Sequence, residues 1–93
     1  MQDSAKNNSI ILIKTLGSII EKHRKEQGKT IYGISAESSM SKSTWREAEL
    51  GTCNDINLTT LWKIAEGLDI TPAKLLEELK DKLGADFTLT GLN

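Results

Sequence analysis

Six residues near the middle of the chain carry hydrogen-bonding side chains close together in sequence: Ser41, Lys42, Ser43, Thr44, Arg46 and Glu47. A lysine can donate to guanine O6 or N7, and a serine can donate or accept at a base edge. Thr44 and Arg46 suit phosphate oxygens, with help from the backbone N–H groups near Ser41. Glu47 could accept a hydrogen bond from cytosine N4, or it could repel phosphates and limit affinity. These residue types indicate contact with double-stranded nucleic acid.

A short amphipathic helix would place these side chains on one surface. The pattern predicts a helix over residues 42–50, because Ser41 can cap its first turn and Gly51 can end it. Trp45 and Ala48 share the opposite face of that helix. A helix with a buried seam and short polar side chains on its first exposed turn fits the major groove of DNA.

Another short helix is predicted just before it, over residues 31–38. Thr30 can cap this helix, and Ile34 faces the core. Gly33 and several serines make the segment a poor intrinsic helix, so packing must hold it in place. The two helices are joined by a hinge of small residues at 38–41, as in a helix-turn-helix motif.

Three further helices are predicted from apolar spacing and end signals. The first covers residues 10–28, although the β-branched run at 10–14 could instead be a short strand. The fourth begins after Asn57, with a broad buried face made by Leu58, Leu61, Trp62, Ile64, Ala65 and Leu68. The fifth runs to residue 83 from Thr71-Pro72, where the missing proline N–H costs nothing. The expected fold class is therefore all-α.

The two ends of the chain differ in pattern from the helical domain at 10–83. Residues 1–9 lack an apolar period and are expected to be a flexible N-terminal tail. Residues 84–93 alternate apolar and polar side chains, which predicts a short strand. Because a lone strand is unstable in water, this C-terminal tail would pair with its twin in a dimer or with the run at 10–13, or lie disordered.

Composition places the 93 residues in a single helical domain. Hydrophobic residues make up 38% and aromatic residues 4%, so Leu and Ile must supply the core, which favours a helical bundle over a β-sandwich. No run of about 18 apolar residues is present, which excludes a membrane span. The single Cys53 cannot form an internal disulfide and fits a cytoplasmic protein.

The sequence contains few of the residues that catalytic or metal-binding sites require. The chain has one histidine, one cysteine and no glycine-rich phosphate loop. His23 is expected at the surface or rim of the bundle, and Cys53 has no partner at metal-ligand spacing. We therefore expect no enzyme activity, no metal, no cofactor and no small-molecule ligand.

Charge is distributed unevenly along the chain, although the net charge is only −1. Residues 1–52 carry eight Lys/Arg and six Asp/Glu, a balance of +2, whereas residues 53–93 carry four and seven, a balance of −3. The positive balance lies in the half that contains the two short helices. A monomer with so little positive charge would bind nucleic acid weakly, so a homodimer on a two-fold site is expected.

Residues 16–79 resemble the phage-repressor/Cro-like (XRE-type) helix-turn-helix DNA-binding family, with a spacing that runs unbroken from Arg24 to Leu76. The residues that carry the resemblance are Leu16-Gly17, Ile20, Arg24, Gly28, Ile34, Ser41-Lys42-Ser43-Thr44, Glu49, Gly51, Leu58, Leu61, Ile64-Ala65, Leu68 and Leu75-Leu76. The chain departs from the family at Ile31, where a phosphate-binding Gln is usual, and at Ile34-Ser35 and Ser38-Ser39, where Leu-Ala and Ala-Gly are usual. The resemblance implies a five-helix repressor-like bundle.

The resemblance also implies roles for individual residues. Lys42 and Ser43 stand where family members read base edges, and Glu47 stands at a second reading position. Asn54 and the loop N–H groups of residues 52–55 would clamp the DNA backbone. The implied partner is double-stranded DNA.

Two further features of the resemblance concern packing. Arg24 and Glu49 correspond to a partly buried ion pair that locks the 42–50 helix to the first helix; the alternative is two exposed charges that never meet. Trp45 stands where the family has a β-branched residue, and Ala48 where it has a large apolar one. We interpret this difference as an exchange of volume within the core. The alternative is that Trp45 stacks on a base.

Together with the resemblance, these observations predict a sequence-specific double-stranded DNA-binding transcriptional regulator, expected to be a repressor that acts as a homodimer. The alternative is a protein-interaction module, such as an antitoxin, antirepressor or scaffold, that keeps the fold but binds DNA weakly. Ile31 in place of Gln, the carboxylate of Glu47 and the acidic net charge favour this alternative.

Overall fold

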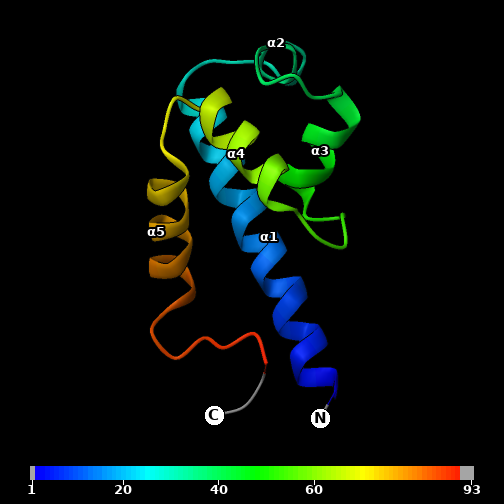
Figure 1. The fold of residues 1–93 in the computed structure, drawn as a ribbon, viewed down its shortest axis with the longest axis vertical. Helices are drawn as coiled ribbons and strands as arrows, with labels where there is room; N and C mark the ends of the chain where they lie inside the picture. The colour runs from blue at the N-terminus through cyan, green and yellow to red at the C-terminus, as the bar shows by residue number, and fades with distance from the viewer. Residues whose placement is uncertain (1, 91–93) are drawn as a thin grey trace.

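The computed structural model describes residues 2–90 and contains five α-helices within them (Figure 1). They are α1 Gln2–Glu26, α2 Ile31–Glu37, α3 Lys42–Leu50, α4 Leu58–Gly67 and α5 Pro72–Leu83. No strand occurs among these residues, so the predicted all-α, five-helix architecture is confirmed. The long α1 forms the axis of the bundle and contacts both α3 and α5, while α2 lies across its C-terminal end (Figure 1).

Side-chain caps begin the four helices that follow α1, as their local sequence predicts. In each of them the capping side chain accepts a hydrogen bond from the backbone N–H three residues later: Thr30 (3.0 Å), Ser41 (3.1 Å), Asn57 (2.8 Å) and Thr71 (3.0 Å). A cap of this kind contributes roughly 0.5–2 kcal/mol. Because the capping bond joins near neighbours in sequence, these helix starts can be predicted without knowledge of the packing.

The first helix is longer than predicted. It begins at Gln2, so residues 2–9, expected as an N-terminal tail, form its first turns instead. No glycine or proline occurs before Gly17, and extending an existing helix costs far less than starting one. The side-chain amide of Asn8 also donates to the backbone carbonyl of Thr88 at 2.6 Å, which ties this half of α1 to the C-terminal segment.

The C-terminal segment 84–90 forms turns and bends, and the short strand considered for it is absent; residues 91–93 lie outside the described residues. The segment turns back toward the N-terminal half of α1 (Figure 1), where Phe87 and Leu12 border the same apolar groove. The run at 10–13, a candidate strand partner, is helical, and its backbone groups already bond within α1. A strand at this place therefore has no edge inside the chain with which to pair.

The core fills the space between the helices. Its buried side chains are Leu16, Ile19, Ile20, Ile34, Trp45, Ala48, Leu61, Ile64, Ala65, Leu68, Leu75 and Leu79. The Trp45 side chain is fully buried, so its ring is part of the core and is not available to stack on a base. Burying a large apolar side chain contributes about 1.5–3 kcal/mol, which makes this set the main source of stability.

Two residues predicted on the buried face of α4 are exposed instead. Leu58 is 67% exposed and Trp62 is 50% exposed. The buried row on α4 runs through Leu61, Ile64 and Leu68, and the other helices cover only that part of its circumference. The predicted apolar face of α4 was therefore too broad.

A buried polar network joins α3 to α1. Arg24 donates to both carboxylate oxygens of Glu49, from Nε to Oε2 at 2.5 Å and from Nη2 to Oε1 at 3.0 Å. The indole Nε1–H of Trp45 donates to Glu49 Oε2 at 2.6 Å, and Arg24 Nη1 donates to the Lys29 carbonyl at 2.8 Å. The Glu49 side chain is only 4% exposed. The ion pair implied by the resemblance is therefore present, and the hydrogen bond with Glu49 raises the pKa of the Arg24 guanidinium.

Two glycines let α1 and α3 approach until their backbones touch. A Cβ atom at Gly17 would lie 2.4 Å from the Glu49 carbonyl oxygen and 2.5 Å from that of Ala48. A Cβ atom at Gly51 would lie 2.8 Å from Lys14 Cα, and Gly51 ends α3 with φ +69°. This close approach brings the Glu49 carboxylate within reach of α1.

Gly67 on α4 packs closely against Ser38 and lies beside the Trp45 indole. A Cβ atom at Gly67 would lie 3.5 Å from Trp45 Cη2 and 3.0 Å from Ser38 Cβ. Ala48 is also buried, and its carbonyl oxygen lies against Gly17. The exchange of volume between Trp45 and Ala48 stays a prediction, and the close approach at Gly67 concerns Ser38 more than the indole.

Replacing Gly17 with alanine should destabilise the fold by about 1–3 kcal/mol, because the new methyl group would push α1 away from the α3 backbone. This clash outweighs the better helix propensity of alanine. Urea unfolding followed by circular dichroism would measure the loss. Ser18→Ala, on the exposed side of the same helix, should change stability by less than about 0.5 kcal/mol. Equal unfolding midpoints for Gly17→Ala and the wild type would contradict the close contact.

Replacing Arg24 with alanine should cost about 3–5 kcal/mol, because the Glu49 carboxylate would stay buried without its cation. The matched control is Lys25→Ala. Lys25 and Glu21 form a 3.3 Å pair whose side chains are 64% and 45% exposed, and such a pair contributes at most about 1 kcal/mol. Chemical denaturation compares the two variants, and equally small losses would show that the network does not hold α3.

Candidate nucleic-acid interface

Six of the predicted contact residues are exposed at the start and on the outward side of α3. We call this surface the α3 outer face; it consists of Ser41, Lys42, Ser43, Thr44, Arg46 and Glu47. Trp45, Ala48 and Glu49 are buried on the opposite side of the helix. The network with Arg24 and the buried indole therefore set the rotation of α3 about its axis. The C-terminal segment 84–90 lies toward the other end of α1 and leaves this surface uncovered (Figure 1).

The capping hydroxyls order the beginning of the α3 outer face. Ser41 Oγ accepts from the backbone N–H of Thr44 at 3.1 Å and donates to Thr44 Oγ1 at 2.8 Å. The Thr44 hydroxyl accepts in this bond, so its own hydrogen can still reach a phosphate oxygen. The N–H groups of the first turn of a helix also favour an anion. The start of α3 is therefore chemically suited to a phosphate.

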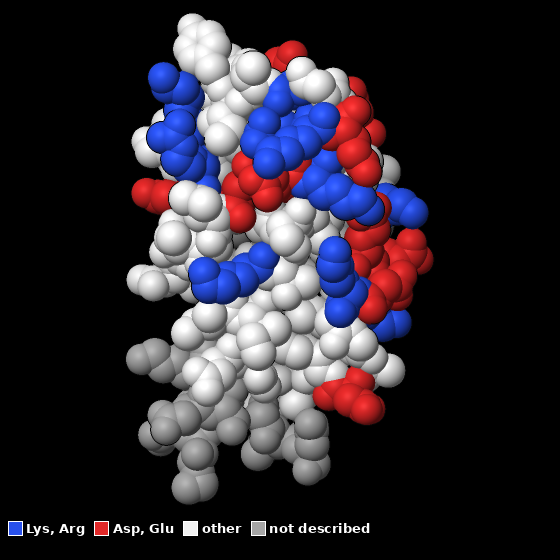
Figure 2. Space-filling view, turned by 180° about the vertical axis from the view of Figure 1, so that it is seen from behind, with Lys and Arg blue, Asp and Glu red and all other residues white. Residues whose placement is uncertain are grey.

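The α3 outer face carries both signs of charge. Lys42 and Arg46 are exposed on it, and so is Glu47. Among the described side chains of residues 7–90, none forms a salt bridge with either of these two cations. On one side of the molecule, Lys and Arg are interspersed with Asp and Glu over the upper part of the view (Figure 2). An anionic partner would thus meet two cations without a salt bridge and one carboxylate on the α3 outer face.

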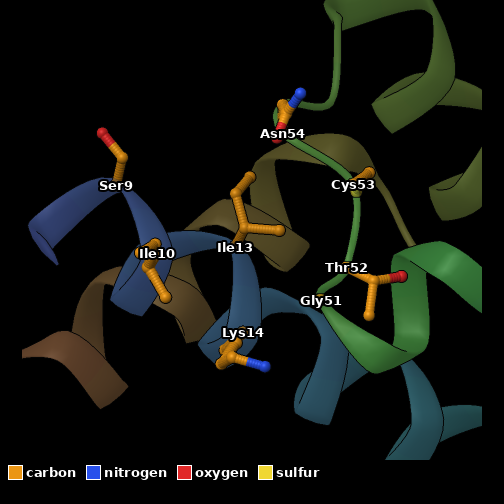
Figure 3. A pocket seen from close by; sticks show the side chains of 8 residues that line it. All are labelled: Ser9, Ile10, Ile13, Lys14, Gly51, Thr52, Cys53 and Asn54. Atoms are coloured by element: carbon orange, nitrogen blue, oxygen red, sulfur yellow. The ribbon is translucent and has the colours of Figure 1, made fainter. Parts of the chain in front are cut away.

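Asn54 lies apart from the α3 outer face, beyond the C-terminal end of the helix. It is exposed in the loop between α3 and α4, whereas Lys42 is the first residue of α3. Asn54 and Thr52 line a groove of about 430 Å³ opposite Ile13 and Lys14 of α1 (Figure 3). The structure therefore brings Asn54 next to α1 and does not bring it to the reading residues.

Cys53 and His23, the residues considered for catalysis or metal binding, lie in surroundings that do not favour either role. Burial raises the pKa of the Cys53 thiol, which disfavours the reactive thiolate. His23 Nε2 lies 2.8 Å from Glu78 Oε1 and joins α1 to α5. In the part of the chain that the structure describes, no three His, Cys, Asp or Glu side chains are grouped to hold a metal. No helix in that part combines the length and apolarity needed to cross a membrane.

Tyr32 and Lys29 make contacts that sequence spacing does not reveal. Lys42 Nζ lies 5.4 Å from the ring centre of Tyr32, a residue of α2 that is 70% exposed. Lys29 Nζ donates to the Gly67 carbonyl at 3.0 Å and lies 3.3 Å from Glu37 Oε1. A cation is favourable at the last carbonyls of a helix, so Lys29 connects the C-terminal end of α4 with α2. Both contacts depend on how the helices pack.

Comparison with models of protein families finds no match to this chain, and comparison with curated proteins finds none either. Among solved structures, the chain is similar to the clp gene regulator ClgR from C. glutamicum, with a TM-score of 0.70 and 21% sequence identity. The similarity covers 81% of this chain and 96% of that chain. The chain therefore shares the helical fold of a protein named as a gene regulator.

Proposed function

We propose that this protein is a sequence-specific double-stranded DNA-binding transcriptional regulator of the XRE-type helix-turn-helix family, and that it represses by occupying promoter DNA. The observation that carries the proposal is the α3 outer face, whose basic and hydroxyl side chains are exposed while the other side of α3 is buried. A helix presented in this way fits the major groove. The fold shared with a protein named as a gene regulator supports the same function.

The side chains at the start of α3 would divide the work between bases and phosphates. Lys42 would donate to guanine O6 or N7, and Ser43 would donate to or accept from a base edge. Thr44 and Arg46 would bind phosphates next to the N–H groups that follow Ser41. The base contacts would supply sequence preference, and the phosphate contacts would supply register and affinity.

Glu47 and Asn54 would contribute farther along the helix. Glu47 would accept a hydrogen bond from cytosine N4 at a second reading position. Asn54, beyond the C-terminal end of α3, would bind the DNA backbone together with the N–H groups of the loop at 52–55. Contacts at both ends of α3 would fix how the helix lies along the groove.

The small charge of the chain favours action as a homodimer. With a net charge of −1, one protomer gains little from releasing counterions on DNA. Two copies related by a two-fold axis would double the number of phosphate contacts. Their half-sites would lie about 34 Å apart, one helical turn of DNA.

A protein-interaction role is the second candidate, and Glu47 is the observation that favours it. Its carboxylate is exposed on the α3 outer face, where it would repel phosphates if no cytosine lay opposite. Ile31 packs against the core, at the position where the resemblance expects a phosphate-binding Gln. An antitoxin, antirepressor or scaffold would keep this fold but bind duplex DNA weakly.

Selection of bound sequences from random duplexes should yield a preferred site for the wild type. In Lys42→Ala and Ser43→Ala, the preference should relax at individual base pairs, with a loss of about 1–3 kcal/mol of discrimination at each. Lys74→Ala on α5 makes the same change of charge away from the α3 outer face and should leave the preference unchanged. A uniform loss of affinity in the first two variants would place these side chains on phosphates.

The salt dependence of binding separates the two candidate functions. A DNA-binding regulator should bind duplex DNA at ~50 mM salt and lose affinity steeply as salt is added, because phosphate contacts release counterions. Fluorescence anisotropy with a labelled duplex would measure this slope. The absence of binding even at ~50 mM salt would contradict the regulator and support the protein-interaction module.

Sedimentation equilibrium with a duplex that carries the selected site should detect two protein chains per duplex. The reason is the small charge of one protomer, which needs a second copy to reach specific affinity. The same duplex with one half-site scrambled is the control and should bind much more weakly. One chain bound with full affinity to a single half-site would contradict the homodimer while leaving DNA recognition intact.

A further inference from the structure

The side chain of Tyr32 lies where packing does not require an aromatic residue. Tyr32 is the second residue of α2 and is 70% exposed, whereas its neighbour Ile31 packs against the core. The start of α2 is fixed, because Thr30 Oγ1 accepts from the Gly33 N–H at 3.0 Å. The direction in which the Tyr32 ring leaves α2 is therefore set by an ordered helix start.

The ring of Tyr32 is next to the first residue of α3. Lys42 Nζ lies 5.4 Å from the ring centre, within the range in which an ammonium is attracted to the face of an aromatic ring. The turn between the helices brings the two residues together, and Ser39 within it adopts φ 59°. Among the described side chains of residues 7–90, no carboxylate forms a salt bridge with Lys42. The Lys42 ammonium therefore has the Tyr32 ring as its neighbour on this surface.

We infer that Tyr32 is a positioning residue for Lys42, and that its ring holds the lysine ammonium over the α3 outer face in the direction of a base edge. The inference rests on the proposed DNA-binding function. A lysine side chain is long and flexible, and it loses rotamer freedom when it docks on a base. A ring that restricts the ammonium beforehand reduces this loss, which is the general benefit of preorganisation.

The effect of Tyr32 should therefore depend on its ring and on Lys42. Phenylalanine offers the same ring face without the hydroxyl, whereas leucine offers neither the ring nor its negative face. The ring should sharpen the preference at the base pair that Lys42 reads and should have little effect on contacts elsewhere. If the Tyr32 hydroxyl instead bound a phosphate, its removal would weaken binding to all sequences alike.

The experiment measures the affinity of Tyr32→Leu and Tyr32→Phe for two duplexes. One carries the selected site, and the other carries the same site with a substitution at the base pair that Lys42 reads. The ratio of the two affinities is the discrimination. Tyr32→Leu should lose about two- to five-fold of the discrimination between the two duplexes, as expected for an exposed cation–π contact. Tyr32→Phe should retain it. In a Lys42→Ala background, Tyr32→Leu should have no further effect. Circular dichroism should show both variants folded, because the side chain is largely exposed.

Three results would overturn the assignment of Tyr32. The first is unchanged discrimination in Tyr32→Leu, and the second is an equal, sequence-independent loss in Tyr32→Leu and Tyr32→Phe. The third is a full effect of Tyr32→Leu without Lys42. Failure of the proposed function looks different, since the wild type itself would then select no sequence. In that case Tyr32 would have no base contact to position, and the inference would fall as well.

Discussion

The carboxylate of Glu49 is the group on which the arrangement of this protein depends. It is almost completely removed from solvent, and a charge in that position is tolerable only when donors surround it. Arg24 supplies two of those donors from α1, and the indole of Trp45 supplies a third from α3 itself. Rotation of α3 about its axis would break both bonds to Arg24, whereas the bond from Trp45 lies within α3 and holds the carboxylate on the inner side of that helix. The network therefore determines which side of α3 faces the protein and which side faces a partner.

Close packing and the polar network support one another. Gly17 lets the two backbones touch, which brings Glu49 to α1, and the buried Trp45 indole donates to the same carboxylate from within α3. The inner side chains of α3, Trp45, Ala48 and Glu49, make the packing contacts and buried hydrogen bonds that hold the helix in place. The side chains of the α3 outer face are exposed and are not needed for that packing. That division is what makes the α3 outer face suitable for the proposed recognition of DNA. The mixed charge of this surface makes a second copy important to the proposal.

Much of the candidate interface could be predicted from the sequence. Ser41, Lys42, Ser43, Thr44, Arg46 and Glu47 are close in sequence on a helix whose two ends carry recognisable signals, so helical geometry alone places them on neighbouring exposed positions. Asn54 could not be placed in this way, because the loop after Gly51 carries no periodic pattern, and it lies opposite α1. Tyr32 was also beyond prediction, since its contact with Lys42 depends on the path of the turn between two helices.

The sequence by itself determined the all-α class and the starts of four helices, because capping bonds and apolar periods act between residues a few positions apart. Only the tertiary structure decided features that depend on distant residues. The bond from Asn8 to Thr88 joins the two ends of the described chain, where the sequence predicted a tail and a strand. Packing likewise decided that Trp45 is buried and Trp62 exposed, although both occur in amphipathic helices. Local chemistry sets where a helix begins, whereas the shape of its neighbours sets which of its faces is covered.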